Sequence, residues 1–353
     1  MTRQTAVVIC PGRGTYNKPE LGYLARHHAD NAVMLARFDT ERAALGQETL
    51  VALDSAETYS NARHTRGDNA SALIYAATIS DFMSINRDAY DVVAITGNSM
   101  GWYSALACGG ALKPDAGFTV ANTMGRLMQE SMIGGQLIYP FVDEQWQPIP
   151  GKRAELLALV DTIATRADHI LTLSIDLGGM LVLAGNENGL KAFESVVPVV
   201  QGRYPLRLAN HAAFHSALQT PVAGKGCAHI SADLFASPTI PLIDGRGAIW
   251  WPHATDSARL YEYTLGHQVT QTYDFTRAVQ VATYEFAPDV IIIVGPGTTL
   301  GGAVAQSLIL GNWRGLSGKD DFQARQASDQ PPLLAMGVDT QRDRVVSIAR
   351  LRR

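Results

Sequence analysis

The stretch Val92–Gly109, VVAITGNSMGWYSALACG, decides the fold because three structural signals follow one another in it without a gap. The run Val92–Thr96 predicts a buried parallel strand. GNSMG (97–101) comes next, and the small and apolar residues of Trp102–Cys108 recur at helical spacing. A strand, G-x-S-x-G and a helix are the context of a nucleophile elbow, in which a serine hydroxyl is exposed on a sharp turn. The alternative is a glycine-rich loop whose serine caps the helix.

The overall composition is that of a folded globular protein, with 353 residues of which 46% are hydrophobic and 18% charged. The net charge of −4 argues against a nucleic-acid-binding surface, and no apolar run has transmembrane length. Three cysteines cannot all pair and no Cys/His cluster has ligand spacing, so we expect no metal site. The adjacent His27 and His28 are expected to form a surface pair. Met1–Cys10 leads into a strand without a signal-peptide pattern, so we expect a cytoplasmic protein.

The order of predicted elements indicates a parallel α/β arrangement. Thr5–Cys10 is a buried strand, and the tight loop after it, PGRGT (11–15), can present main-chain N–H groups to an anion or to an oxyanion hole. Helices are expected over Asn69–Ile85 and Ala116–Met132, and another buried strand over Val290–Val294. The polar segment Ser317–Pro332 is expected to be a mobile surface loop.

Residues 133–208 show a different pattern, β-α-β-β-α-β, which indicates a ferredoxin-like insert. The predicted fold class is therefore α/β. A parallel-sheet, α/β-hydrolase-like large subdomain is formed by residues 1–132 plus 209–353, and the inserted small subdomain by residues 133–208. We expect the insert to form one wall of a cleft whose other wall contains Ser99.

Six separated motifs then occur in one order along the chain, namely PGRGTY (11–16), GNSMGWYSALACGGAL (97–112), MGRLMQES (124–131), AAFHSALQTP (212–221), HQVTQTYDF (267–275) and VGPGTTLGG (294–302). Each is a weak signal alone. Together they resemble the motifs of the malonyl-CoA:acyl-carrier-protein transacylases and the acyltransferase domains of polyketide synthases. The ferredoxin-like insert also matches the small subdomain of this family.

The resemblance implies a role for several residues. Ser99 is the nucleophile and His215 the general base, although without the resemblance a core or helix-capping histidine would be the favoured interpretation of His215. A main-chain carbonyl near Gln268 holds the histidine ring, and the N–H groups of Met100 and Arg13 form the oxyanion hole. The implied activity belongs to fatty acid or polyketide biosynthesis. An acyl group moves from CoA to the phosphopantetheine thiol of an acyl carrier protein, with a CoA thioester as substrate and no cofactor.

The chain departs from the family pattern at expected substrate-binding positions. Asn98 replaces the histidine of the elbow, Trp102 replaces a glutamate, and Met124 stands where the family has the arginine that holds the malonyl carboxylate. Phe214 gives the A-F-H form that the family links to small acyl groups. Met124 and Phe214 together favour a neutral acyl group over malonyl.

Several alternatives remain at this point. Arg13 or Arg126 are the nearest cations that can replace the missing arginine, although Arg126 follows Met124 by two helical positions and is expected to face away. The chain can also be a hydrolase of acyl-carrier-protein thioesters, or a catalytically weak module that binds a carrier protein. An ordinary α/β-hydrolase explains the elbow but does not predict the insert.

Overall fold

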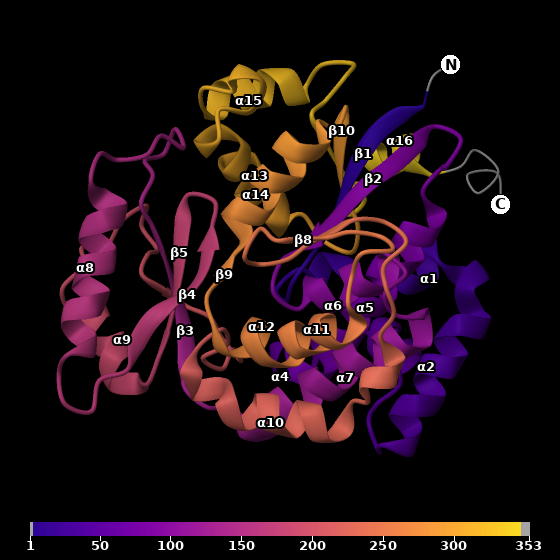
Figure 1. Ribbon diagram of the computed structural model, residues 1–353, viewed down its shortest axis with the longest axis horizontal. Coiled ribbons are helices and arrows are strands. Elements are labelled where there is room, and N and C mark those ends of the chain that lie inside the picture. The colour runs from indigo at the N-terminus through magenta and orange to yellow at the C-terminus, as the bar shows by residue number, and fades with distance from the viewer. Residues whose placement is uncertain (1–2, 347–353) are drawn as a thin grey trace.

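Two β-sheets organise the chain, one at the centre of the large subdomain and one in the small subdomain (Figure 1). This computed structural model describes residues 3–346. Between the sheets lie the segments that hold the predicted nucleophile and base, which are far apart in the sequence. The fold class is therefore α/β with two subdomains, as the sequence predicted.

The large sheet has six strands in the order β11-β10-β1-β2-β7-β8. Neighbours are parallel from β11 to β7, and β8 is antiparallel to β7. The strands are β1 (Gln4–Cys10), β2 (Tyr90–Gly97), β7 (Leu242–Ile243), β8 (Ile249–Trp250), β10 (Val290–Ile293) and β11 (Leu333–Ala335). The central strands are nearly continuous runs of buried apolar residues, the pattern of strands covered on both faces.

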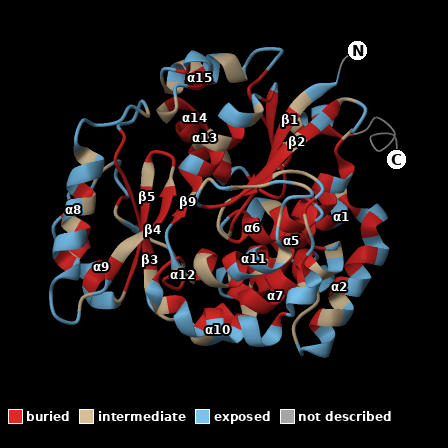
Figure 2. Ribbon diagram, in the orientation of Figure 1, coloured by how far each residue is buried: buried red, intermediate tan, exposed pale blue. Residues whose placement is uncertain are grey.

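Helices surround this sheet, and their inward faces are buried (Figure 2). They are α1 (Tyr23–His27), α2 (Ala32–Ala44), α3 (Leu50–Asp54), α4 (Asn61–His64), α5 (Gly67–Ser84), α6 (Gly101–Cys108), α7 (Pro114–Ser131), α10 (Thr220–His229), α11 (Ser257–Glu262), α12 (Gln268–Thr270), α13 (Phe275–Phe286), α14 (Thr299–Leu310), α15 (Lys319–Gln326) and α16 (Asp339–Val345). Helices α5, α6 and α7 pack on one another, and α6 packs against β1 and β2. Almost every residue of α5 is buried, so this helix is part of the core rather than a surface helix.

Short helical turns complete the chain. The 3₁₀ turns are η1 (Lys18–Glu20), η2 (Ala29–Asn31), η3 (Ala217–Gln219), η4 (Ala232–Leu234) and η6 (Trp313–Gly315), and one π-helical turn is η5 (Tyr263–His267). The π turn joins α11 to α12. It therefore ends directly before Gln268. Single π-helical turns are often found at functional sites.

The small sheet has five strands in the order β6-β3-β5-β4-β9. They are β3 (Gly135–Pro140), β4 (Leu171–Leu177), β5 (Met180–Gly185), β6 (Leu206–Arg207) and β9 (Tyr273–Asp274), and the two helices on the outer face are α8 (Lys152–Ala164) and α9 (Glu187–Glu194). The first four strands give the β-α-β-β-α-β order expected from the sequence. The fifth strand, β9, was not expected in this sheet, and it pairs in parallel with β4 from a later part of the chain.

The carboxyl ends of three neighbouring parallel strands define where a ligand can bind. β1 lies between β2 and β10. The next strand of this sheet along the chain, β2, is therefore on one side of β1, and the later strand β10 is on the other. The loops after these strands, residues 11–15, 98–99 and 295–298, therefore meet at one edge of the sheet. Open α/β sheets bind ligands at such a topological switch point.

One prediction from the sequence is wrong. Half of Ser317–Pro332 is not a loop, because Lys319–Gln326 forms α15. The one buried residue of this helix is Phe322, whose ring centroid lies 6.2 Å from that of Trp146. Separately, no helix within residues 3–346 is long and apolar enough to cross a membrane.

Candidate active site

Ser99 lies on the sharp turn between β2 and α6. Its φ of +54° is in the left-handed region that most side chains avoid. A Cβ added at Gly97 would lie 2.3 Å from the carbonyl oxygen of Gly101, and a Cβ added at Gly101 would lie 2.2 Å from that of Cys10. Neither position accepts a side chain, so the two glycines of G-x-S-x-G allow the strand and the helix to meet closely enough to expose Ser99.

Ser99 and His215 are hydrogen-bonded although 116 residues separate them, with Ser99 Oγ 2.8 Å from His215 Nε2. On the other side of the ring, Nδ1 lies 2.5 Å from the main-chain oxygen of Gln268. A carbonyl can only accept a hydrogen bond, so Nδ1 holds the proton and Nε2 is free to accept the hydroxyl proton of Ser99. Burial lowers the pKa of His215 to about 4, against the opposing effect of the Gln268 hydrogen bond. The ring is therefore neutral at physiological pH.

Gln268 contacts both members of this pair. Besides its main-chain oxygen, its side-chain Nε2 donates to the carbonyl oxygen of Ser99 at 3.1 Å. Its Oε1 in turn accepts from the hydroxyl of Tyr103 at 3.2 Å. Tyr103 was not predicted from the sequence, although its position in the first turn of the helix that follows Ser99 was a signal for it.

The small subdomain supports the histidine loop from the other side. Gln136 of β3 donates to the hydroxyl of Ser174 at 2.7 Å, and Ser174 of β4 donates to the main-chain oxygen of Phe214 at 2.8 Å. These side chains were also not predicted. They connect the small sheet to the residue next to His215, so the position of the base depends on both subdomains.

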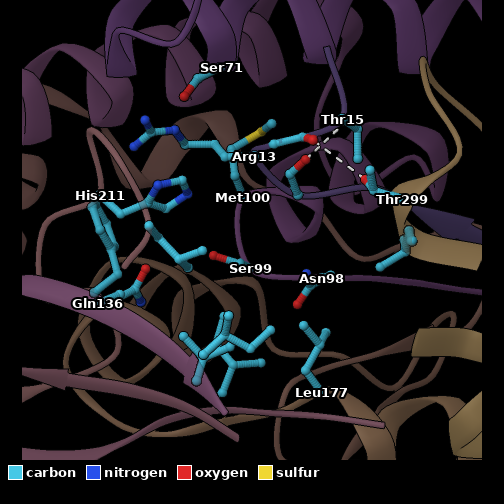
Figure 3. Close-up of a pocket in the computed structure, with 18 of the residues that line it drawn as sticks. Arg13, Thr15, Ser71, Asn98, Ser99, Met100, Gln136, Leu177, His211 and Thr299 are labelled. Carbon is cyan, nitrogen blue, oxygen red and sulfur yellow. Dashed lines mark hydrogen bonds between the residues drawn. The ribbon is translucent and has the colours of Figure 1, made fainter. Parts of the chain in front are cut away.

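A cavity of about 1220 Å³, its open mouth included, lies between the two sheets and borders Ser99. The small sheet contributes an apolar wall of Ile138, Ile175, Leu177, Met180 and Val182. In Figure 3, Arg13 and His211 lie on one side of Ser99, and Thr299 lies on the other. Thr299 is exposed, whereas Ser71, Met124 and Met128 are each only 1% exposed. The cavity thus has an open end near Thr299 and a closed end near α5 and α7.

The predicted substrate-binding residues divide into two groups. Met124, Phe214 and Asn98 line the cavity. Trp102 does not border it, contrary to the prediction, because its ring turns into the core, where Nε1 donates to the hydroxyl of Thr264 at 3.0 Å. Sequence alignment with the family motif gave the position of Trp102 but not the direction of its side chain.

The two candidate cations also differ in position. Arg126 forms an ion pair with Glu130 at 2.7 Å and borders a different surface cavity, so it faces away from Met124 as expected. Arg13 borders the cavity that contains Ser99. Burial lowers the pKa of Arg13 to about 10, which still leaves it charged at neutral pH. Within the described residues, no group of three or more His, Cys, Asp or Glu side chains could hold a metal ion.

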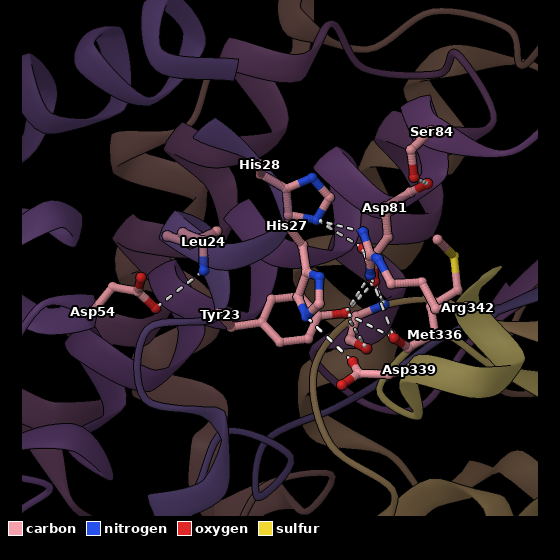
Figure 4. A network of polar contacts seen from close by, with 11 residues as sticks. Tyr23, Leu24, His27, His28, Asp54, Asp81, Ser84, Met336, Asp339 and Arg342 are labelled. Atoms are coloured by element: carbon pink, nitrogen blue, oxygen red, sulfur yellow. Dashed lines mark hydrogen bonds and ion pairs between the residues drawn. The ribbon is translucent and has the colours of Figure 1, made fainter. Parts of the chain in front are cut away.

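A second cluster of buried polar side chains lies outside this cavity (Figure 4). Asp81 of α5 accepts hydrogen bonds from the Tyr23 hydroxyl, from Arg342 of α16 and from the N–H of Gly295, each at 2.7 Å, and lies 2.8 Å from His28. Burial alone would raise the pKa of Asp81, but the hydrogen bond with His28 and the charge of Arg342 lower it to about 2. His28 is fully buried, so the expected surface pair is wrong.

Comparison with models of known protein families gives no match. Individual sequences do match. A malonyl CoA-acyl carrier protein transacylase of Salmonella typhimurium is 22% identical over 303 residues, which cover 83% of this chain and 90% of the relative. The transacylase of Haemophilus influenzae is 22% identical over 321 residues, covering 89% of this chain and 95% of the relative.

Solved structures share the fold. The malonyl-CoA:ACP transacylase of Synechocystis has a TM-score of 0.73 at 17% identity, with 97% of this chain and all of that chain covered. A malonyl-transacylase solved in complex with its type II polyketide synthase acyl-carrier protein has a TM-score of 0.71 at 18% identity, with 97% and 99% covered.

The two-subdomain α/β fold is that of solved malonyl-CoA:ACP transacylases. Among proteins of this fold, the sequence relatives support the family of malonyl-CoA:acyl carrier protein transacylases and polyketide synthase acyltransferases. This is the family that the six motifs resemble.

Proposed function

We propose that this protein transfers an acyl group from CoA to the phosphopantetheine thiol of an acyl carrier protein through an ester on Ser99. The observation that supports this most is the hydrogen bond of 2.8 Å between Ser99 Oγ and His215 Nε2, on a ring whose other nitrogen is held by a carbonyl. This is the arrangement of a nucleophile, its base and the group that orients the base.

In the first half-reaction, Ser99 Oγ attacks the thioester carbonyl and His215 Nε2 takes the hydroxyl proton. The oxyanion that forms faces the main-chain N–H groups of Met100 and Arg13. Neither N–H is bonded to an acceptor among the described residues, which supports this role. The carbon–sulfur bond then breaks, and the CoA thiolate leaves with the proton that His215 held.

In the second half-reaction, the thiol of the carrier protein gives its proton to His215 and attacks the Ser99 ester. The ester bond breaks, and Ser99 regains its proton from His215. Besides the two substrates, the proposed chemistry uses only groups of this chain and requires no cofactor. The carrier protein as partner is supported by the names of the sequence relatives and by the neighbour solved with its acyl-carrier protein.

For the acyl group, we propose a neutral chain rather than malonyl. Met124 supplies no charge to the closed end of the cavity, and Arg126 is outside it. A buried carboxylate without a partner costs several kcal/mol. The remaining cation, Arg13, borders the cavity, but its Nη2 already donates to two main-chain oxygens.

Mass spectrometry after incubation with acetyl- or butyryl-CoA tests the intermediate. We expect a single acyl adduct, on Ser99, and none in the Ser99→Ala variant. Ser71→Ala is the matched control, because Ser71 is the other serine that borders the cavity, and it should keep the adduct. An adduct on Cys10, Cys108 or Cys227 would overturn the assignment of the nucleophile.

The fate of the adduct tests the second half-reaction. With a holo carrier protein present, the acyl group should appear on the carrier thiol faster than free acid forms. Equal release of free acid with and without the carrier would indicate a hydrolase. Absence of any adduct, with binding to a carrier protein retained, would indicate a catalytically inactive binding module.

A further inference from the structure

Arg13 reaches across the cavity to two distant segments. Its Nη2 donates to the main-chain oxygens of Thr65 at 2.9 Å and of Asn210 at 2.7 Å, and its Nη1 lies 2.8 Å from the sulfur of Met128. The two segments that Arg13 contacts are also bonded to each other, because Asn210 Nδ2 donates to the hydroxyl of Thr65 at 2.6 Å. The loop after β1, the residue that ends α4 and the loop before His215 are therefore tied together at one point.

These contacts leave Arg13 poorly suited to hold a carboxylate. A guanidinium binds a carboxylate with two parallel N–H bonds from two of its nitrogens. The pairs that can do this are Nε with Nη2 and Nη1 with Nη2, so both need one N–H of Nη2. Both hydrogens of Nη2 already go to main-chain oxygens. The Nε is buried and has no hydrogen-bond partner among the described residues, but a single N–H is not a bidentate site. The position of Arg13 thus indicates a structural tether rather than a clamp for an anion.

The tether lies where the cavity ends. Ser71, Met124 and Met128 form the closed end, and Arg13 contacts Met128 there. In Figure 3 the side chain of Arg13 extends past Ser71 on the side of Ser99 away from Thr299. An acyl chain bound to Ser99 and directed away from the open end would meet this side chain.

We propose that Arg13 closes the acyl end of the cavity and so determines the longest acyl chain that the protein accepts. This inference rests on the proposed function, since it assumes that the acyl group is attached to Ser99. Arg13 acts on the substrate by filling space and by holding Thr65 and Asn210 in place. The wild-type protein should therefore prefer short neutral acyl groups.

The test is the ratio of kcat/KM for octanoyl-CoA to that for butyryl-CoA, measured in each variant. Arg13→Ala and Arg13→Gln shorten the side chain and release the tether, and should raise this ratio at least about tenfold, since each newly buried methylene is worth about fourfold. Arg13→Met keeps an unbranched side chain without the charge and should raise it less. Arg126→Gln is the matched control, because it changes an arginine outside the cavity, and should leave the ratio unchanged.

Two outcomes would overturn the proposal. One is an unchanged chain-length ratio in folded Arg13→Ala. The other is a fall in the use of malonyl-CoA relative to acetyl-CoA in Arg13→Met, which would assign Arg13 to anion binding instead. If Arg13→Ala does not fold, Arg13→Gln gives the same readout, and Asn210→Ala, which removes the bond from the Asn210 side chain to Thr65 but keeps the main-chain oxygen that Arg13 contacts, should shift the ratio in the same direction by a smaller factor. The Ser99 adduct, recorded in parallel, separates failure of this proposal from failure of the proposed function.

Discussion

His215 is the residue on which the proposed chemistry depends most. His215→Ala should slow acylation of Ser99 by roughly 10²–10⁴-fold, as expected when a general base is lost. Because burial lowers the pKa of His215 to about 4, the base is mostly unprotonated above about pH 5. The acylation rate should therefore stay level from pH 7 to about pH 5 and fall as the pH approaches 4. Single-turnover acylation across this pH range measures both effects.

His211 provides the internal control for this residue. It borders the same cavity, but its Nδ1 bonds the main-chain oxygen of Ala209, and it has no hydrogen bond to Ser99. His211→Ala should therefore change the rate only slightly. A larger loss in His211→Ala than in His215→Ala, or a rate that falls with a midpoint near pH 6.5, would contradict the role given to His215.

At the scale of the element, helix α7 directs two side chains that are close in sequence to different sides of the helix. Met124 faces the cavity and Arg126 faces solvent, because two helical positions rotate a side chain by about 200°. Met124→Arg should raise kcat/KM for malonyl-CoA relative to acetyl-CoA at least about tenfold, since a cation then faces the acyl group. Met132→Arg is the control, because Met132 directly follows α7, is 36% exposed and does not border the cavity, and it should leave this ratio unchanged. A wild-type preference for malonyl-CoA would refute the proposed neutral specificity.

The elements that could be predicted from the sequence are those whose pattern is local. The strand before Ser99 and the helix after it are contiguous and periodic, and so are α5, α7 and the strands of the insert. β9 is only two residues long and is a strand because β4 lies beside it, 98 residues earlier at Ile175 and Tyr273. α15 has one buried apolar residue and hence no apolar stripe to detect.

In the candidate site too, the sequence predicted what a local pattern encodes and missed contacts between distant residues. Ser99, His215 and Gln268 could be named because each lies in a motif. The contacts of Tyr103, and the tether made by Arg13, depend on side-chain directions that no motif encodes. His28 was misplaced because its partners, Asp81 and Arg342, are 53 and 314 residues away.

At the scale of the whole molecule, Asp81 joins the first and last helices of the chain to its centre. Asp81→Asn would leave the Arg342 guanidinium buried without its anion, and should lower the free energy of unfolding by about 3 kcal/mol. Urea unfolding measures this. Asp115→Asn is the control, because the Arg37–Asp115 pair is more than half exposed on both sides and should contribute less than about 1 kcal/mol. Equal losses in the two variants would contradict the importance given to the buried cluster.

The strand β9 has a consequence for how the molecule moves. It pairs with β4 of the small sheet, its Tyr273 hydroxyl bonds the carbonyl of Gly97 in the large sheet, and α13 starts at the next residue. A rotation that moved the two sheets apart would break the pairing of β9 with β4 or displace the turn that holds Ser99. The two sheets are thus fastened to each other at Tyr273, whose hydroxyl also holds the end of the strand that leads to Ser99. We therefore expect the cavity to keep its width, so that an acyl group is selected by the fixed shape of the cavity rather than by closure of the two sheets around it.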